Sequence, residues 1–380
     1  MPAQLALTLH NAIGEIPAGD WNLCAGAANP FVSHEFLSAI EDSGSTGRGA
    51  GWIPWHAAIR HADGKIAAVV PLYEKTHSYG EYVFDHAWAQ ALDRAGEHYY
   101  PKLQIAVPFT PVPGPRLLRR PGVELGPLAH GLTEICQEFQ HSSVHVTFCS
   151  AAEWEEFGRI GWLQRTGVQF HWQNQGWRDF DEFLGALASR KRKSIRHERS
   201  KVQLLGLEIR TLRGGDIKSA HWDAFYRFYR STVDRKWGSA YLKRGFFPLI
   251  ASLLGDRVVL MMAFADGVPV AGALNLVGAD TLYGRNWGAR GEYPFLHFEL
   301  CYYRAIDFAL EHGLARVEAG AQGEHKIQRG YLPVPTYSAH WIAHKGLSAA
   351  VAQYLNSERA AVDAQIRDLA ELSPYRRENN

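Results

Sequence analysis

The sequence of 380 residues predicts an α+β fold made of two similar units. Ala62-Asp-Gly-Lys-Ile-Ala-Ala-Val aligns with Ala265-Asp-Gly-Val-Pro-Val-Ala-Gly, 203 residues further along the chain. In each segment an Asp-Gly turn joins two apolar runs, which indicates a β-hairpin. After each hairpin the patterns of a strand, a helix and a strand follow in the same order. A repeat of this kind indicates that one structural unit is present twice.

The first unit is expected to alternate strands and helices. In residues 31–43 the side chains of Phe36, Leu37 and Ile40 mark one helical face, and Ser33 can cap the helix start. The expected helices of this unit are 31–43 and 124–140, and the expected strands are 52–60, 66–74, 104–108, 116–118 and 144–149.

The second unit repeats this order. Asp179 suits the start of its first helix, and Gly313 suits the position after its last one. Its expected helices are 179–205, 216–234 and 296–311, and its expected strands are 207–212, 257–264, 270–277, 281–287 and 314–318. We therefore predict domains at residues 1–165 and 166–345, followed by a helical tail at 346–380.

Charge and cysteine content exclude several classes of protein. The net charge is +1, so nucleic acid or membrane would have to be bound through a local patch. The four cysteines form no CxxC pair, which argues against a zinc ribbon or a disulfide scaffold and suits a reducing cytoplasm. No run of about 18 apolar residues and no secretory signal pattern is found, and we expect a cytoplasmic protein.

One segment combines closely spaced glycines with many polar side chains. From Arg316 to Tyr331 the sequence begins as a strand, breaks at Gly320 and Gly323, and then carries mostly polar or ionisable residues up to Arg329. Buried polar groups of this density need partners, and loops at strand ends are frequent ligand sites. This segment is therefore a candidate binding loop.

The order of elements and several segments resemble a known family. The segments are 75–88, 99–118, 296–303, and Gly320-Ala-Gln-Gly-Glu-His-Lys326 with its continuation to His340-Trp341. Together they are similar to tandem GNAT acyltransferases, and more specifically to the bacterial Fem-like group of N-acyltransferases. The resemblance implies two tandem GNAT-like units with mixed central sheets. It also implies transfer of an acyl or aminoacyl group to an amine, for example on a peptidoglycan or other cell-envelope precursor.

The resemblance leaves two donors open. GNAT proteins commonly use acyl-CoA, whose pyrophosphate lies on a Gly-rich loop, whereas Fem-like proteins often use aminoacyl-tRNA. Residues 119–126 occupy the place of that loop but contain only two glycines. The implied partners are thus an acyl-CoA or aminoacyl-tRNA donor and an amine acceptor, without a metal.

Acyl transfer to an amine needs a base, an oxyanion donor and positioning groups. In a strand, Glu81 and Asp85 would face one side, where two acids could bind or activate an amine. The candidate catalytic residues are Glu81, Asp85, Glu299, Glu324 and His325. The candidate substrate-binding residues are Tyr82, Arg116, His297, Gln322, Lys326 and Arg329. We expect them to line a cleft between the two units. For each of these residues, the alternative explanation is an ordinary salt bridge or exposure to solvent.

A basic helix is a second candidate site. Residues 189–201 hold seven Lys or Arg residues and one Glu, and Arg192, Arg196 and Arg199 share one side, next to Lys193. This side could bind RNA phosphates or anionic lipid head groups, or it could be an ordinary solvated face. The alternative to an enzyme is accordingly a binding protein that holds RNA or anionic lipid. His297 and Glu299 are two residues apart, a spacing that does not suit metal ligands on a helix.

Overall fold

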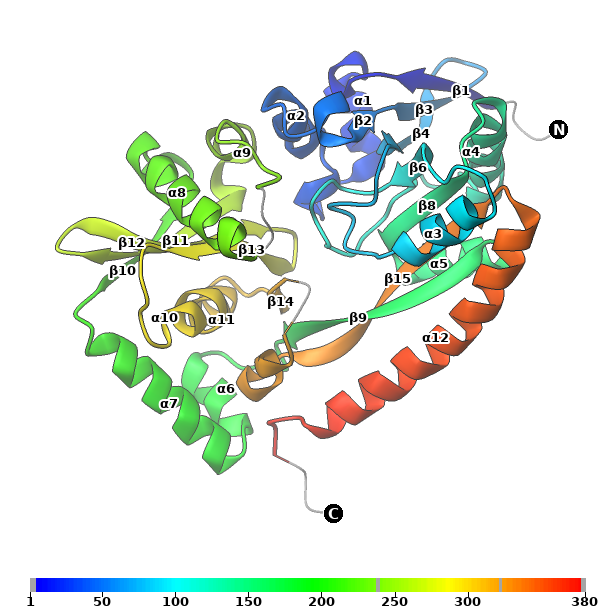
Figure 1. Cartoon of the computed structure of the whole chain (residues 1–380). Coiled ribbons are helices and arrows are strands. Elements are labelled where there is room, and N and C mark those ends of the chain that lie inside the picture. The colour runs from blue at the N-terminus through cyan, green and yellow to red at the C-terminus, as the bar shows by residue number, and fades with distance from the viewer. Residues whose placement is uncertain (1–4, 237–239, 321–322, 377–380) are drawn as a thin grey trace. The chain divides into compact units, whose positions relative to one another are not determined.

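The structure, a computed structural model, describes residues 5–236, 240–320 and 323–376 and divides into two compact units (Figure 1). Unit 1 contains Met1–Gly167 and Pro335–Ala364, and unit 2 contains Val168–Val334 and Gln365–Asn380. The first change of unit thus lies two residues from the boundary expected at 165/166. Residues 335–345 belong to unit 1 instead of the second domain, because they continue into a strand that pairs with the sheet of unit 1.

Unit 1 contains two sheets. Its strands are β1 (Leu5–His10), β2 (Trp52–Pro54), β3 (His56–His61), β4 (Ile66–Val70), β5 (Leu72–Lys75), β6 (Lys102–Ile105), β7 (Leu118–Arg119), β8 (Ser143–Cys149) and most of β15 (Leu332–Ile342). The antiparallel order β1-β3-β4-β7 forms the smaller sheet. In the order β15-β8-β6-β5-β2, β6 and β8 are parallel and the other neighbours are antiparallel.

Helices cover the sheets of unit 1. They are α1 (Ala18–Ala25), α2 (His34–Asp42), α3 (His86–Arg94), α4 (Leu125–Glu138), α5 (Ala151–Arg159) and most of α12 (Lys345–Glu371). In α4, Leu125, Leu128 and Leu132 recur at helical spacing and are buried against the apolar side chains of β8. The expected C-terminal tail is α12, whose Leu347 and Leu355 belong to the same buried apolar cluster as Trp88 of α3.

Unit 2 is a mixed sheet between two helical layers. Its strands are β9 (Leu163–Gln173), shared with unit 1, β10 (Glu208–Arg213), β11 (Val258–Ala265), β12 (Val268–Val277), β13 (Thr281–Ala289) and β14 (Arg316–Glu318). The order is β10-β11-β12-β13-β14-β9, in which β13 and β14 are parallel and the other neighbours are antiparallel. At the β11–β12 hairpin, Asp266 and Gly267 have φ of 49° and 75°, as the Asp-Gly turn requires.

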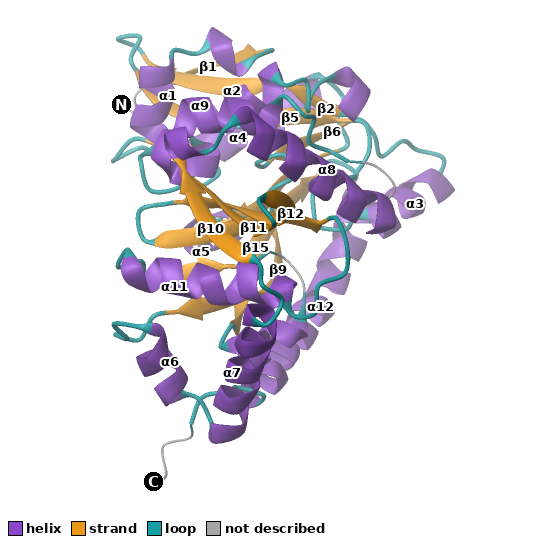
Figure 2. Ribbon diagram, turned by 90° about the vertical axis from the view of Figure 1, so that its left-hand side faces the viewer, coloured by secondary structure: helices purple, strands orange, loops and turns teal. Residues whose placement is uncertain are grey.

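The helices of unit 2 lie on both faces of this sheet (Figures 1 and 2). They are α6 (Phe180–Ala186), α7 (Ser189–Gln203), α8 (Ser219–Lys236), α9 (Phe246–Leu254), α10 (Leu296–Phe298) and α11 (Arg304–Glu311). A π-helical turn, Glu299–Tyr303, joins α10 to α11. Helices α8 and α9 cover one face, and α10 and α11 cover the other. No described helix is long and apolar enough to cross a bilayer.

The helix expected at 179–205 is two helices. Asp179 caps α6 by accepting a hydrogen bond from the backbone N–H of Glu182. The chain then becomes extended at Leu187, whose side chain is fully buried and whose backbone forms a bridge with Tyr375. Because this contact is distant in sequence, the uninterrupted helical pattern could not indicate the break.

We predict that Gly288→Ala destabilises the protein, because β13 approaches α8 closely at this position. A Cβ on Gly288 would lie 2.2 Å from the carbonyl oxygen of Phe228. Since a backbone atom cannot move aside alone, we expect a loss of about 1–3 kcal/mol in the free energy of unfolding by urea. Gly185→Ala in α6 is the control, because nothing lies within 4 Å of its Cβ. Equal stability of the two variants would contradict this packing.

Candidate functional site

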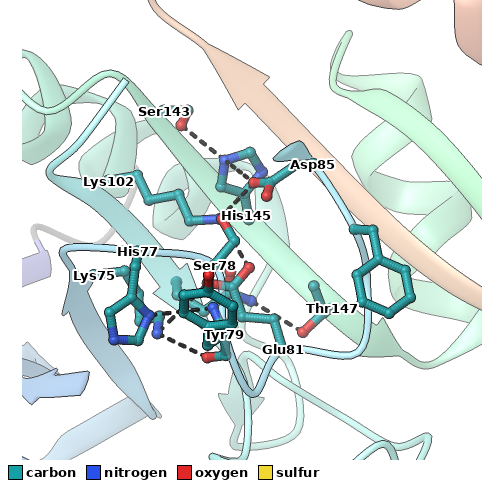
Figure 3. Close-up of polar contacts among 12 residues, drawn as sticks. Lys75, His77, Ser78, Tyr79, Glu81, Asp85, Lys102, Ser143, His145 and Thr147 are labelled. Atoms are coloured by element: carbon teal, nitrogen blue, oxygen red, sulfur yellow. Dashed lines mark hydrogen bonds and ion pairs between the residues drawn. The ribbon is translucent and has the colours of Figure 1, made fainter. Parts of the chain in front are cut away.

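A buried cluster of charged side chains lies at the ends of β5 and β6 in unit 1 (Figure 3). The Lys102 ammonium donates hydrogen bonds to Glu81 Oε2 at 2.8 Å, to Asp85 Oδ2 at 2.5 Å and to Ser78 Oγ at 2.9 Å. Lys102 is fully buried, and the two acidic residues are each 4% exposed. Burial lowers the pKa of Lys102, but Glu81 and Asp85 outweigh that effect and hold the pKa above its ordinary value.

Lys75 completes this cluster. It lies directly opposite Lys102 in the β5–β6 ladder, where like charges repel. Its Nζ is 3.7 Å from Glu81 Oε1 and 4.0 Å from the centroid of the Trp52 ring. Burial lowers the pKa of Lys75 to about 7, despite the attraction of Glu81. Two acids thus compensate two lysines, which allows all four groups to be buried together.

A chain of hydrogen bonds continues from this cluster to two histidines. The Tyr99 hydroxyl donates to Asp85 Oδ2 at 2.7 Å and lies 3.0 Å from His145 Nε2. The Nδ1 atoms of His145 and His340 are 2.7 Å apart, so one must donate and the other accept. Burial lowers the pKa of His145 to about 3 and the pKa of His340 well below its usual range. Both imidazoles are therefore neutral at pH 7.

The segment from Glu81 to Asp85 is an irregular loop and not the expected strand. Tyr82 has a φ of 59°, which a strand excludes. The expected alternation is nevertheless present: Glu81 and Asp85 point inward, whereas Tyr82 and Phe84 are 40% and 59% exposed. The attraction of Lys102 for both carboxylates explains this arrangement. The catalytic roles of Glu81 and Asp85 and the substrate contact of Tyr82 stay predictions.

In unit 2 a cavity of about 80 Å³ lies where the central strands approach the π-helical turn. A bulge after Leu274 of β12 places Asn275 opposite Gly284 of β13. The neighbouring strand β14 ends at Glu318, opposite Tyr283, while β13 continues to Ala289. This gap in strand pairing adjoins the cavity. Its lining includes Asn275, Gly284, Trp287, His297, Tyr302 and Ala319.

Glu318, at the end of β14, is a buried acid without a strong partner. Its side chain is 9% exposed, and its Oε2 has no hydrogen-bond partner among the described residues. His171 Nδ1 is 3.8 Å from Glu318 Oε1, and burial lowers the pKa of His171 to about 3, so this imidazole is neutral. Burial raises the pKa of Glu318 to about 8, with smaller opposing effects of Arg316 and Arg285.

The backbone of Glu318 borders the cavity. A Cβ on Gly284 would lie 3.3 Å from the Glu318 carbonyl oxygen, and Ala319, the next residue, is part of the lining. A buried carboxyl group with a raised pKa, on a strand whose end borders a small cavity, is a candidate general base.

The candidate binding loop contains a short 3-10 helix, Glu324–Arg329. Lys326 is buried, its Nζ donates to the Gly320 carbonyl at 2.8 Å, and burial lowers its pKa to about 7. Glu324 and His325 are exposed, and His325 Nε2 lies 2.9 Å from the Tyr302 hydroxyl. Gln322 lies outside the described residues.

Two of the predicted site residues of unit 2 belong to ion pairs with α7. Arg329 donates to both carboxylate oxygens of Glu198, at 2.8 and 2.9 Å, and lies over the Phe298 ring. Glu299 accepts hydrogen bonds from Arg199 and Arg304 through Oε1, each at 3.1 Å. Burial raises the pKa of Glu299 more than these two arginines lower it. The catalytic and binding roles of these residues stay predictions.

The side chain of Arg116 in unit 1 bonds to backbone groups and not to the lysine cluster. It is fully buried and donates to the backbone carbonyls of Val112, Gly114, Pro115 and Thr147. These bonds hold the Pro-rich loop of residues 108–115 against β8. Burial lowers the pKa of Arg116 to about 10, although Glu153 opposes this effect. Its role in binding substrate stays a prediction, as does a cleft between the units.

The sequence from residue 12 to residue 377 matches a family model described as peptidoglycan biosynthesis/recognition. The chain belongs to the FemAB-like family. No curated protein matches this FemAB-like chain significantly.

Several solved structures are similar to this FemAB-like chain. FemX is 12% identical, covering 91% of this chain and 100% of FemX, with a TM-score of 0.55. L-PGS from Bacillus licheniformis is 8% identical, over 87% of this chain and 98% of L-PGS, with a TM-score of 0.52. The C-terminal domain of a putative lysylphosphatidylglycerol synthetase from Agrobacterium fabrum is 10% identical, over 89% and 96%, with a TM-score of 0.56. At these identities the likeness shows the fold alone. The predicted α+β fold of two tandem GNAT-like units, in the Fem-like group, is confirmed.

Sequence reasoning did not select several ionisable residues of this FemAB-like chain that are now candidates. These are Lys75, Lys102, His145, His340, His171 and Glu318. A signal existed for the two lysines, because each stands at the end of a strand pattern, where a charged side chain that becomes buried needs a partner. Glu318 likewise follows a buried valine at a strand end. No group of three or more metal-ligating side chains occurs in the described part of the chain.

We predict that Lys102→Met strongly destabilises the protein. The substitution leaves Glu81 and Asp85 without their shared cation, and breaking a buried pair in this way costs about 3–5 kcal/mol. Urea denaturation measures the loss. Lys65→Met is the control, because its pair with Asp63 is exposed and contributes less than about 1 kcal/mol. A loss as small as that of the control would show that the cluster is solvated.

We also predict a pH dependence of stability that originates from Glu318. Its pKa is raised to about 8 in the folded state from the ordinary value of 4.5, so the folded protein binds the extra proton between these values. The corresponding stabilisation is complete below about pH 4.5 and is lost as the pH rises through 8. Glu318→Gln should remove several kcal/mol of this dependence, measured by urea denaturation from pH 5 to 9. Parallel profiles for both proteins would contradict the raised pKa.

Proposed function

We propose that this chain is an N-acyltransferase that moves an acyl or aminoacyl group from an activated carbonyl donor to an amine of a cell-envelope component. The observation that carries the proposal is the raised pKa of Glu318, whose backbone borders the unit 2 cavity. An amine acceptor is protonated at neutral pH and must lose its proton before it attacks. A carboxylate whose pKa is about 8 can take that proton near neutral pH.

In the proposed reaction Glu318 takes the first proton from the ammonium group and passes it to solvent, and the neutral amine nitrogen then attacks the donor carbonyl carbon. Glu318 accepts the second proton, which the nitrogen must lose to become an amide nitrogen. The carbonyl oxygen becomes an oxyanion in the tetrahedral intermediate. The carbon–sulfur or carbon–oxygen bond to the leaving group then breaks, an amide forms, and the leaving group takes up a proton. Lys326 is the proposed source of that proton, because burial lowers its pKa to about 7 and it can donate near neutrality.

The cavity supports a location for the acyl group. It is small and lies where strand pairing stops, with Trp287 and His297 in edge-to-face contact at 5.2 Å along its wall. The π-helical turn that supplies Tyr302 supports a ligand site here, because π-bulges are frequent at functional sites. Acyl-CoA and aminoacyl-tRNA both present an activated carbonyl, and both remain proposed donors.

The envelope acceptor is supported by the family, whose description concerns peptidoglycan. The name of one similar structure, a putative lysylphosphatidylglycerol synthetase, also concerns an envelope component. A cytoplasmic location is part of this proposal.

The proposal predicts that Glu318→Gln lowers kcat/KM by about 10²–10⁴-fold. For the natural sequence, kcat/KM should pass through a maximum between pH 7 and 8, because Glu318 must be ionised and Lys326 must be protonated. The assay offers acyl-CoA and aminoacyl-tRNA in parallel to an amine-bearing peptidoglycan precursor. Glu324→Gln is the matched comparison, since it removes an exposed acid from the neighbouring loop.

Loss of activity in the Glu324 variant with full activity in the Glu318 variant would contradict the role of Glu318. Binding of the precursor without transfer from either donor would favour the alternative, a binding protein on this scaffold.

A further inference from the structure

The charged residues of α7 fall into two groups. The inner group forms contacts with the rest of unit 2. Arg199 pairs with Asp307 at 2.7 Å, and Glu198 accepts hydrogen bonds from Arg329 and Tyr303. Glu198 is the only acidic residue of α7. The inner contacts fix the orientation of the helix and use its one negative charge.

The outer group forms a stripe along the exposed face of α7. Arg190, Lys193, His197 and Lys201 recur at spacings of three or four residues, so they lie above one another on one side of the helix. All four are exposed, and no carboxylate pairs with them in the part of the chain that the structure describes. Ser189 and Ser194 lie beside Arg190 and Lys193 in a shallow hollow. We call these four residues the outer stripe.

This stripe differs from the face expected from the sequence. Of the predicted anion-binding residues, Lys193 lies on the outer stripe, and Arg192 is half-buried. Arg196 pairs with Asp181 at the exposed surface, and Arg199 belongs to the inner group. A helical pattern alone shows which residues share a side, but it does not show which side packs inward.

Apolar side chains continue the outer stripe at its C-terminal end. Leu204, three residues after Lys201, is 76% exposed, and Leu205 is 37% exposed. The distance along the helix from Arg190 to Leu204 is about 21 Å, at 1.5 Å per residue. Exposed leucines beside unpaired cations are typical of helices that lie in a membrane interface, where the cations meet anionic head groups and the leucines enter the acyl region.

We propose that α7 docks this protein on an anionic lipid surface through the outer stripe, Leu204 and Leu205. RNA phosphates would engage the cations but give Leu204 no apolar environment, so the leucines favour lipid. The inner ion pairs hold the helix in place and leave the outer stripe free for head groups. Only the purpose of this docking rests on the proposed function: it would bring the enzyme to an envelope component at the membrane.

Co-sedimentation with lipid vesicles tests this proposal without an acyl donor, so its failure leaves the proposed transfer reaction standing. The full chain should bind vesicles that contain phosphatidylglycerol and should not bind vesicles of phosphatidylcholine alone. Binding should weaken with rising salt. Since each cation near an anionic surface strengthens binding about fivefold, Arg190→Gln with Lys193→Gln should weaken it about 30-fold. Leu204→Ser should weaken it further.

Matched controls come from the same unit. Arg227→Gln with Arg230→Gln removes the same charge at the same spacing from α8, and Leu253→Ser changes an exposed leucine of α9. Both controls should bind vesicles as the natural sequence does. If the α7 and α8 variants lose vesicle binding equally, the change in net charge alone explains the loss, and the proposal is overturned. Loss of tRNA binding in the α7 variants with unchanged vesicle binding would also overturn it, in favour of RNA.

Discussion

The proposed proton transfer depends on one constraint: the Glu318 carboxyl group is buried without a cation in contact. The position of Glu318 in the sheet of unit 2 explains this burial. β14 is a short strand between β13 and β9, and the side chain of Glu318 lies on the same face of the sheet as those of its ladder partners Tyr283 and His171. The nearest imidazole, His171, is itself held neutral by burial and supplies no positive charge. An ionised carboxylate in such surroundings is penalised, and its pKa rises.

One buried acid of unit 1, Asp85, shows the opposite behaviour. There Lys102 contacts both Glu81 and Asp85, and the pKa of Asp85 is held well below its usual range, because Lys102 outweighs the effect of burial. Lys102 thus stabilises the ionised form of Asp85, whereas burial raises the pKa of Glu81, and the contacts of Lys102 with both acids fix the conformation of the loop. We therefore propose the uncompensated acid of unit 2 for proton transfer, while the catalytic roles of Glu81 and Asp85 in unit 1 stay predictions.

Sequence patterns predicted those features that depend on neighbouring residues. The two Asp-Gly hairpins, the helix that became α4 and the strand before the glycine-rich loop follow from local periodicity and turn chemistry. The resemblance to the Fem-like group supplied the fold. The break at Leu187 and the inward side of α7 depend on contacts with residues far along the chain, which periodicity does not contain. The same holds for Glu318, whose importance comes from the strands packed around it. Single charged residues in a strand pattern could have been selected, because burial of such a group always requires a partner or a shifted pKa.

The central claim is that Glu318 holds its proton up to nearly neutral pH, and a direct titration of that carboxyl group tests it best. NMR of protein labelled with ¹³C at the glutamate carboxyl carbons can follow each signal with pH, and Glu318→Gln identifies the signal of Glu318 by its disappearance. The signal of Glu318 is expected to titrate with a pKa of about 8, far above the ordinary glutamate value of 4.5. A Glu318 signal that titrates together with the exposed glutamates would contradict the account.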